Sequence, residues 1–136
     1  MRLNTVMAAL LAAIVHPAAS LVAHHSFAAE FDINQPITLR GTLTKMEWVN
    51  PHGWLHIDVK GPDGKVVSWA IESGSPNSLL RRGLRRTDFV IGSELIVEGY
   101  RAKDGSDKAN GVVVKFTDGR NFFMGTSGGG APEPKQ

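Results

Sequence analysis

The chain has 136 residues, of which 42% are hydrophobic and 21% charged, and this composition is typical of one globular domain and excludes a wholly disordered protein. It contains no cysteine, so disulfides, thiolate metal sites and thiol catalysis are excluded, and any metal must be bound by nitrogen and oxygen. The formal net charge of +2 is too small a surplus to predict nucleic-acid binding.

The first 23 residues have the order of a secretory signal peptide. One early basic residue, Arg2, is followed by an apolar run from Val6 to Val15 and then by small residues. The apolar run is shorter than the roughly 20 residues that cross a membrane, although an uncleaved anchor is the alternative. We expect an exported protein of the bacterial periplasm that meets the membrane only through the transient signal.

Two cleavage sites are compatible with this signal. A cut after Ala23 makes His24 the first mature residue, but it places the bulky Leu21 at position −3. A cut after Ser20 has Ala18 at −3 and begins the chain at Leu21. The choice decides whether His24 carries the terminal amine.

The mature chain begins with an extension, residues 24–35, and we expect the folded domain to span residues 36–124. Residues 37–48 alternate imperfectly between apolar and polar, with a bulge expected at Gly41. Residues 50–53, NPHG, predict a turn, and residues 54–60 alternate cleanly as a strand. The sequence GPDG at 61–64 predicts a hairpin whose return strand is residues 65–72.

A short helix follows, because Ser75 can cap a helix whose first residue is Pro76 and which Gly83 ends after Arg82. Two further strands are predicted at 93–103 and 112–116, residues 121–124 could add a short last strand to these five, and residues 125–136 have the composition of a disordered tail. Five strands with one helix between the third and fourth is the order of the OB-fold. We therefore predict an all-β protein, a small five-stranded OB-like barrel, with an open sandwich as the alternative.

The mature chain has four histidines, in two pairs: His24 with His25, and His52 with His56. A terminal His24 offers its amine and its imidazole to one metal ion, and His52 or His56 would add a third nitrogen. Such a nitrogen set suits Cu(II), so copper is the predicted cofactor, with His25 as a further ligand. The alternatives are a mobile terminus, a turn histidine that bonds a carbonyl, and a half-exposed strand histidine.

Catalytic chemistry is not predicted, because the sequence has no nucleophile elbow, phosphate loop or paired-acid motif. Asp58 shares a strand face with His56 and could orient its ring. For this residue, and for Glu47 and Glu72, we favour a solvated strand face.

A second function class rests on the basic cluster and one tryptophan. The four arginines lie at the end of the predicted helix and just after it, and with Trp54 they could bind an envelope protein, an anionic lipid or a small ligand without any metal. The cluster comprises Arg81, Arg82, Arg85 and Arg86. Such a run is more often a solvated helix end. A nucleic-acid partner is not expected, and we expect a monomer.

The motifs HHSFAAEFD, GTLT, WVNPHGWLHIDV and WAIESGSPNSLLRRG together resemble the Domain of Unknown Function 6152 family of short exported bacterial proteins. The resemblance extends from His24 to about Arg120. It implies an exported small β-barrel and a His-His pair directly after the signal, hence a cut after Ala23. It implies no activity.

Overall fold

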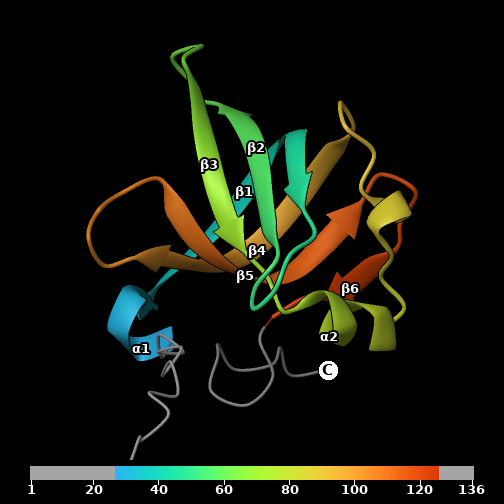
Figure 1. The fold of residues 1–136 in the computed structure, drawn as a ribbon. Coiled ribbons are helices and arrows are strands. Elements are labelled where there is room, and N and C mark those ends of the chain that lie inside the picture. Colours follow the sequence, from blue (N-terminus) through green and yellow to red (C-terminus); the bar gives the residue numbers. More distant parts are fainter. Residues whose placement is uncertain (1–26, 126–136) are drawn as a thin grey trace, which may run out of the picture.

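The computed structural model describes residues 27–125, and these form a predominantly β structure, as predicted (Figure 1). The strands are β1 Phe31–Glu47, β2 Trp54–Lys60, β3 Val66–Glu72, β4 Glu94–Ala102, β5 Lys108–Phe116 and β6 Asn121–Phe123. The helices are α1 Phe27–Glu30, α2 Pro76–Arg81 and the 3-10 turn η1 Arg86–Asp88. The predicted signal peptide, His24, His25 and residues 126–136 of the predicted tail lie outside the described residues.

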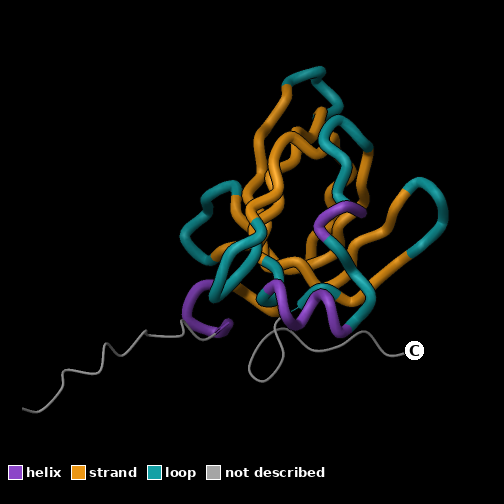
Figure 2. Tube along the Cα trace, turned by 45° about the vertical axis from the view of Figure 1, so that its right-hand side comes forward, coloured by secondary structure: helices purple, strands orange, loops and turns teal. Residues whose placement is uncertain are grey.

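The strands form one sheet in the order β3-β2-β1-β4-β5-β6. All of these neighbours are antiparallel, but β3 also pairs in parallel with β5 through Ala70–Lys108, Ile71–Ala109 and Glu72–Asn110. The pairing therefore runs from β3 through β2, β1, β4 and β5 and returns to β3. In the Cα trace the strands form a ring with α2 at one end (Figure 2). The buried hydrophobic side chains form one core cluster.

Strand β1 is longer than predicted, with 17 residues that begin at Phe31 rather than at residue 37. Its first part pairs with β4 and its second with β2, and Thr42 takes part in both pairings. The early start is explained by Phe31, which lies opposite Ala102 and is buried. The predicted irregularity exists, but the register shifts between Leu43 and Lys45 rather than at Gly41.

The core consists of the inward face of each strand together with α2. In β2 the alternation is as predicted, because Leu55 and Ile57 are fully buried while Trp54 and His56 are partly exposed. Leu79 brings α2 onto this core. Burial of a large aliphatic side chain contributes roughly 1.5–3 kcal/mol, so the alternation fixes which face of the sheet is inside.

The short helix has the predicted start. Ser75 is its N-cap, its Oγ accepts a hydrogen bond from the Ser78 backbone N–H at 3.3 Å, and Pro76 is the first helical residue. The chain leaves the helix at Arg82, and the following Gly83 has a positive φ of 87°. The Ser75 side chain and the backbone turn at Gly83 provide partners for backbone N–H and C=O groups at the helix ends, which would otherwise lack them.

Strand β5 starts at Lys108, four residues before the predicted start at residue 112. The sequence predicts a polar loop at residues 108–110. In the structure all three residues pair with β3, and residues 109–110 also pair with β4. Backbone pairing on both sides outweighs the low strand propensity of these residues.

The close approach of β4 and β5 predicts the effect of one substitution. A Cβ on Gly99 would lie 2.0 Å from the backbone oxygen of Asn110, so Gly99→Ala must push the two strands apart. We expect a loss of about 2–3 kcal/mol in the free energy of unfolding, measured by urea denaturation. Gly105→Asn, in open space on the same hairpin, is the control and should cost less than about 1 kcal/mol. Equal losses for the two variants would contradict this packing.

Candidate functional site

The outer face of the sheet carries a line of functional side chains across five strands. Glu47 lies opposite Trp54, Trp54 opposite Glu72, Glu72 opposite Asn110, and Asn110 opposite Tyr100. Directly opposed residues place their side chains on the same face. We call this line the Trp54 row. Because the neighbouring Leu55 and Ile71 point into the core, the row faces outward.

At one end of the row, His56 pairs with Glu47. The Nε2 atom of His56 lies 3.1 Å from Oε1 of Glu47, and the Lys45 ammonium donates to the same oxygen. The hydrogen bond from Lys45, and secondarily that from His56, hold the pKa of Glu47 below its ordinary value. Glu47 is therefore a carboxylate shared between two donors.

Nearer the middle of the row, His52 pairs with Glu72. Nδ1 of His52 lies 3.3 Å from Oε1 of Glu72, and the two side chains are 25% and 12% exposed. The loop that holds His52 is fixed by two backbone hydrogen bonds, from Gly53 N–H to Gly74 and from Ser73 N–H to Gly53. A carboxylate this buried needs a polar or charged neighbour, and His52 is one.

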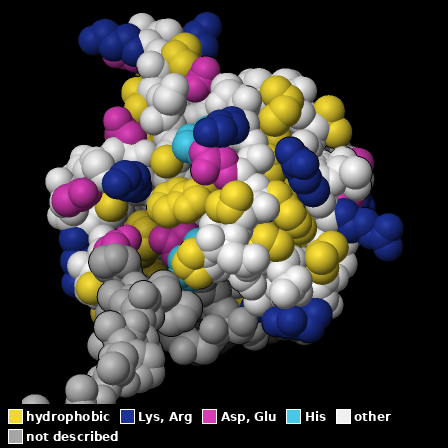
Figure 3. Space-filling view, in the orientation of Figure 1, with side chains coloured by type: hydrophobic (Ala, Val, Ile, Leu, Met, Phe, Trp, Pro, Cys, Tyr) yellow, Lys and Arg dark blue, Asp and Glu magenta, His cyan; other side chains and the backbone are white. Residues whose placement is uncertain are grey.

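The two histidine–carboxylate pairs lie on one face of the molecule. His52 and His56 are the only histidines within residues 27–125, and Figure 3 shows both with acidic side chains beside them and hydrophobic surface between. Trp54, which is partly exposed, lies between the pairs in the strand register. His52 and His56 therefore contact two different carboxylates, Glu72 and Glu47.

No described residues form a complete metal site by themselves. Within residues 27–125 there is no group of three or more His, Asp or Glu side chains placed to hold a metal ion.

The carboxylates of the site differ from those the sequence pointed to. Asp58 does not orient His56 but accepts a hydrogen bond from the Ser68 hydroxyl at 2.5 Å. Glu47 and Glu72, assigned to a solvated face, are the residues that contact the histidines. The signal that identifies Glu72 is the hairpin register, since a turn over residues 61–65 places position 72 opposite Trp54.

The four arginines are spread over α2, the turn after it and η1. Arg81 donates to Ser78 Oγ at 3.2 Å. Arg82 lies over the Phe123 ring at 4.3 Å and donates to the Gly125 carbonyl at 2.5 Å, so it ties α2 to the end of β6. Arg85 and Arg86 are exposed. One arginine of the cluster, Arg82, therefore packs against the end of β6.

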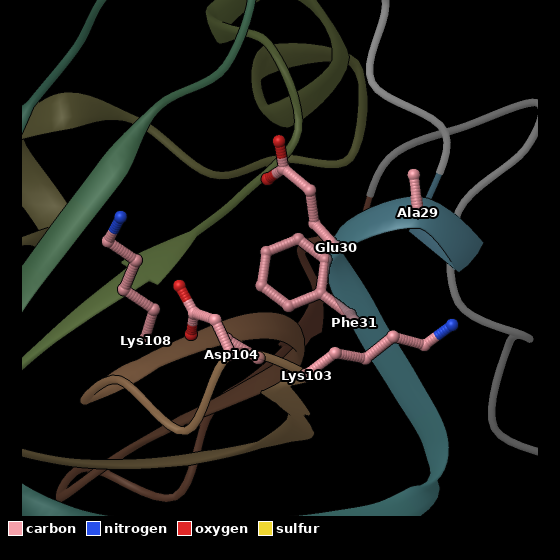
Figure 4. Close-up of a pocket in the computed structure, with 7 residues that line it drawn as sticks. Ala29, Glu30, Phe31, Lys103, Asp104 and Lys108 are labelled. Carbon is pink, nitrogen blue, oxygen red and sulfur yellow. The ribbon is translucent and has the colours of Figure 1, made fainter.

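A cavity of about 440 Å³ lies between α1 and the β4–β5 connection (Figure 4). It is lined by Ala29, Glu30, Phe31, Ala102, Lys103, Asp104 and Lys108. The Lys103 ammonium donates to the Ala28 carbonyl at 2.6 Å, and hydrogen bonds from Ser106 lower the pKa of Asp104. The lining contains both acidic and basic side chains. This cavity was not predicted from the sequence.

Comparison with known proteins gives one match. The model of a family described as "Family of unknown function (DUF6152)" matches residues 11–112. No curated protein and no solved structure matches the chain. Within the described range, none of the helices has the length and apolar character needed to cross a bilayer.

The shared carboxylate predicts how two variants change a titration. Lys45→Met should raise the pKa of Glu47 more than His56→Ala does, because the Lys45 hydrogen bond is the larger influence. Since the folded-state pKa is lowered, this contribution to stability is present above the unfolded pKa and is lost as the pH falls through the folded pKa. Carboxyl-carbon NMR titration measures both shifts, and a larger shift in His56→Ala would contradict the assignment.

Proposed function

The chain belongs to the family of unknown function DUF6152, and from its site we propose that it is an exported periplasmic protein that binds copper. The ligands are the amine and imidazole of a mature N-terminal His24 together with the imidazole of His52. Glu72 or His25 supplies the fourth position. The observation that carries the proposal is the partly buried His52–Glu72 pair on the Trp54 row.

We place this site on a small OB-like barrel. The return of the strand pairing from β5 to β3, in parallel, supports a closed sheet rather than an open sandwich. The position of α2 between β3 and β4 supports the OB order. Such a barrel presents its outer face as a rigid platform on which ligands from a terminal segment converge.

His52 suits a metal better than His56 does. The Nε2 atom of His56 contacts Glu47, and the Lys45 ammonium contacts the same carboxylate. The positive charge of Lys45 disfavours the binding of a metal cation next to it. His52 contacts Glu72, whose partners in the strand register are the uncharged residues Trp54 and Asn110. A carboxylate there either orients the imidazole or binds the metal itself.

The described part of the chain begins at Phe27, beside the Tyr100 end of the Trp54 row. The Phe27 ring lies 5.5 Å from the Tyr100 ring, and Tyr100, Asn110 and Glu72 are consecutive positions of the row. Adjacent strands are about 4.8 Å apart, so Glu72 is about 10 Å across the sheet from Tyr100. His24 is three positions before Phe27, and three residues of extended chain span up to about 10 Å. Two His24 nitrogens, one His52 nitrogen and one oxygen make a set that suits Cu(II).

The role we propose is carriage or buffering of copper, without catalysis. The groups beside the site are carboxylates and imidazoles that either bind the metal or fix its ligands, and the sequence supplies no nucleophilic motif there.

A metal-free binding module is the alternative. Partly exposed Trp54 between two polar pairs favours it, because an aromatic ring flanked by hydrogen-bonding groups is a common anchor for a partner. The exposed Arg81, Arg85 and Arg86 would contact an acidic envelope protein, an anionic lipid or a small ligand.

The copper proposal predicts the behaviour of three variants. Protein purified from the envelope should begin at His24 by intact mass and N-terminal sequencing. In Cu(II) titrations, His24→Ala and His52→Ala should each weaken binding about tenfold or more, and the matched variant His56→Ala should change it little. Affinity should fall from pH 7 to 5, because the ligand nitrogens must lose protons. Parental affinity in both His24→Ala and His52→Ala would refute the site.

The alternative predicts a different pattern. A triple Arg81/Arg85/Arg86→Ala variant should lose partners captured from envelope extract or from vesicles with anionic lipid, and Trp54→Ala should do the same. Arg82 is kept because it packs on Phe123. Equal recovery by the triple variant and the parent would count against the basic surface.

A further inference from the structure

The cavity between α1 and the β4–β5 connection is held in shape by hydrogen bonds across it. The Lys103 ammonium donates to the Ala28 carbonyl at 2.6 Å, and the Lys103 backbone N–H donates to the Glu30 carbonyl at 2.8 Å. These two bonds tie α1 to the residue that follows β4. The space of about 440 Å³ that they border lies within the range of about 300–1,000 Å³ typical of small-molecule sites.

One side of the cavity is apolar. It consists of Phe31, Ala29 and Ala102. Phe31 and Ala102 are direct partners in the β1–β4 pairing and are 3% and 6% exposed, so the strand register fixes their positions. Figure 4 shows the Phe31 ring in the middle of the lining residues. This side suits the hydrocarbon or aromatic part of a ligand.

The Asp104 carboxylate lines the cavity next to the apolar side. The Ser106 hydroxyl and backbone N–H both donate to its Oδ1 atom, at 2.6 Å and 2.9 Å. These hydrogen bonds, and after them the charge of Lys108, hold the pKa of Asp104 below its ordinary value. A carboxylate has acceptor sites on both oxygens, so Oδ2 can accept from a ligand while Ser106 fixes the group through Oδ1.

Lys108 supplies a positive charge near Asp104. It is the first residue of β5 and lies opposite Ala70 in the strand register, so its backbone is fixed while its side chain is exposed. Figure 4 shows its ammonium beside the Asp104 carboxylate and the Lys103 ammonium directed to the other side. With Glu30 and Lys103, the lining holds two acidic and two basic residues, and such a balanced site suits a ligand without net charge.

From this arrangement we infer that the cavity binds an apolar α-amino acid in its zwitterionic form. The ligand carboxylate accepts a hydrogen bond from the Lys108 ammonium, the ligand ammonium donates to Oδ2 of Asp104, and the ligand side chain lies against Phe31. A simple carboxylate or amine offers only one of the two charges and leaves the other protein charge unmatched. The site shares no residue with the proposed copper ligands, so it is a separate binding site.

The test compares three related probes by amide chemical-shift NMR titration of the copper-free protein. L-Phenylalanine carries both charges, phenethylamine carries only the ammonium, and hydrocinnamate carries only the carboxylate. L-Phenylalanine should bind about tenfold more tightly than either single-charge probe, because each charge-assisted hydrogen bond is worth about one power of ten in affinity. The amide signals of Phe31 and Ala102 should shift with it.

Two variants separate the two charges. Lys108→Met should weaken the binding of L-phenylalanine and hydrocinnamate about tenfold and leave that of phenethylamine unchanged. Asp104→Asn should weaken L-phenylalanine and phenethylamine instead and leave hydrocinnamate unchanged. Both positions are exposed, so both variants should fold. Lys60→Met, which removes an exposed lysine at the end of β2, is the control and should change none of the three affinities.

Three outcomes would overturn the site. The first is equal binding of the three probes, and the second is parental affinity for L-phenylalanine in both Lys108→Met and Asp104→Asn. The third is tighter binding of hydrocinnamate than of L-phenylalanine, which would identify a simple anion site. Because the titrations contain no copper, their failure leaves the copper proposal untouched, and failure of the copper site leaves their result intact.

Discussion

The parallel pairing of β3 with β5 is the constraint on which the rest of the structure depends. Three residues of each strand take part, and they bring Glu72 next to Asn110. Without this pairing, β3 would be an edge strand with unpaired backbone groups, and β1, β2 and β4 would separate the two polar side chains in the strand order. The same contact that returns the sheet to its first strand therefore assembles the polar part of the outer face.

The outer face carries charged side chains that are partly removed from water, and this removal costs free energy. Glu72 is largely buried and contacts His52, while the more exposed Glu47 serves both His56 and Lys45. Charged groups removed from water are stable only with such partners. Trp54 separates the two pairs, so each histidine keeps its own carboxylate. The His52–Glu72 pair is the one that we assign to a metal.

Local features of this fold could be predicted from the sequence. The alternation of residues 54–60 and the Ser75–Pro76 helix start depend on neighbours in the chain, and both are confirmed. The contact of His52 with Glu72 was missed because it depends on two elements, the loop at Gly53 and the hairpin register, acting together. Residues 108–110 were missed as a strand because their pairing partners on β3 are nearly 40 positions earlier, and nothing in their own composition indicates pairing. The predicted ligands His24 and His25 lie outside the described residues, so the copper site itself stays a prediction.

The most direct test of the account is the position of copper in the mature protein. A crystal structure of the chain beginning at His24, grown with one equivalent of Cu(II), would locate the metal by its anomalous scattering. The account predicts one copper ion bound by the amine and imidazole of His24 and by His52. Copper at His56 and Glu47, or scattered over surface carboxylates, would contradict it.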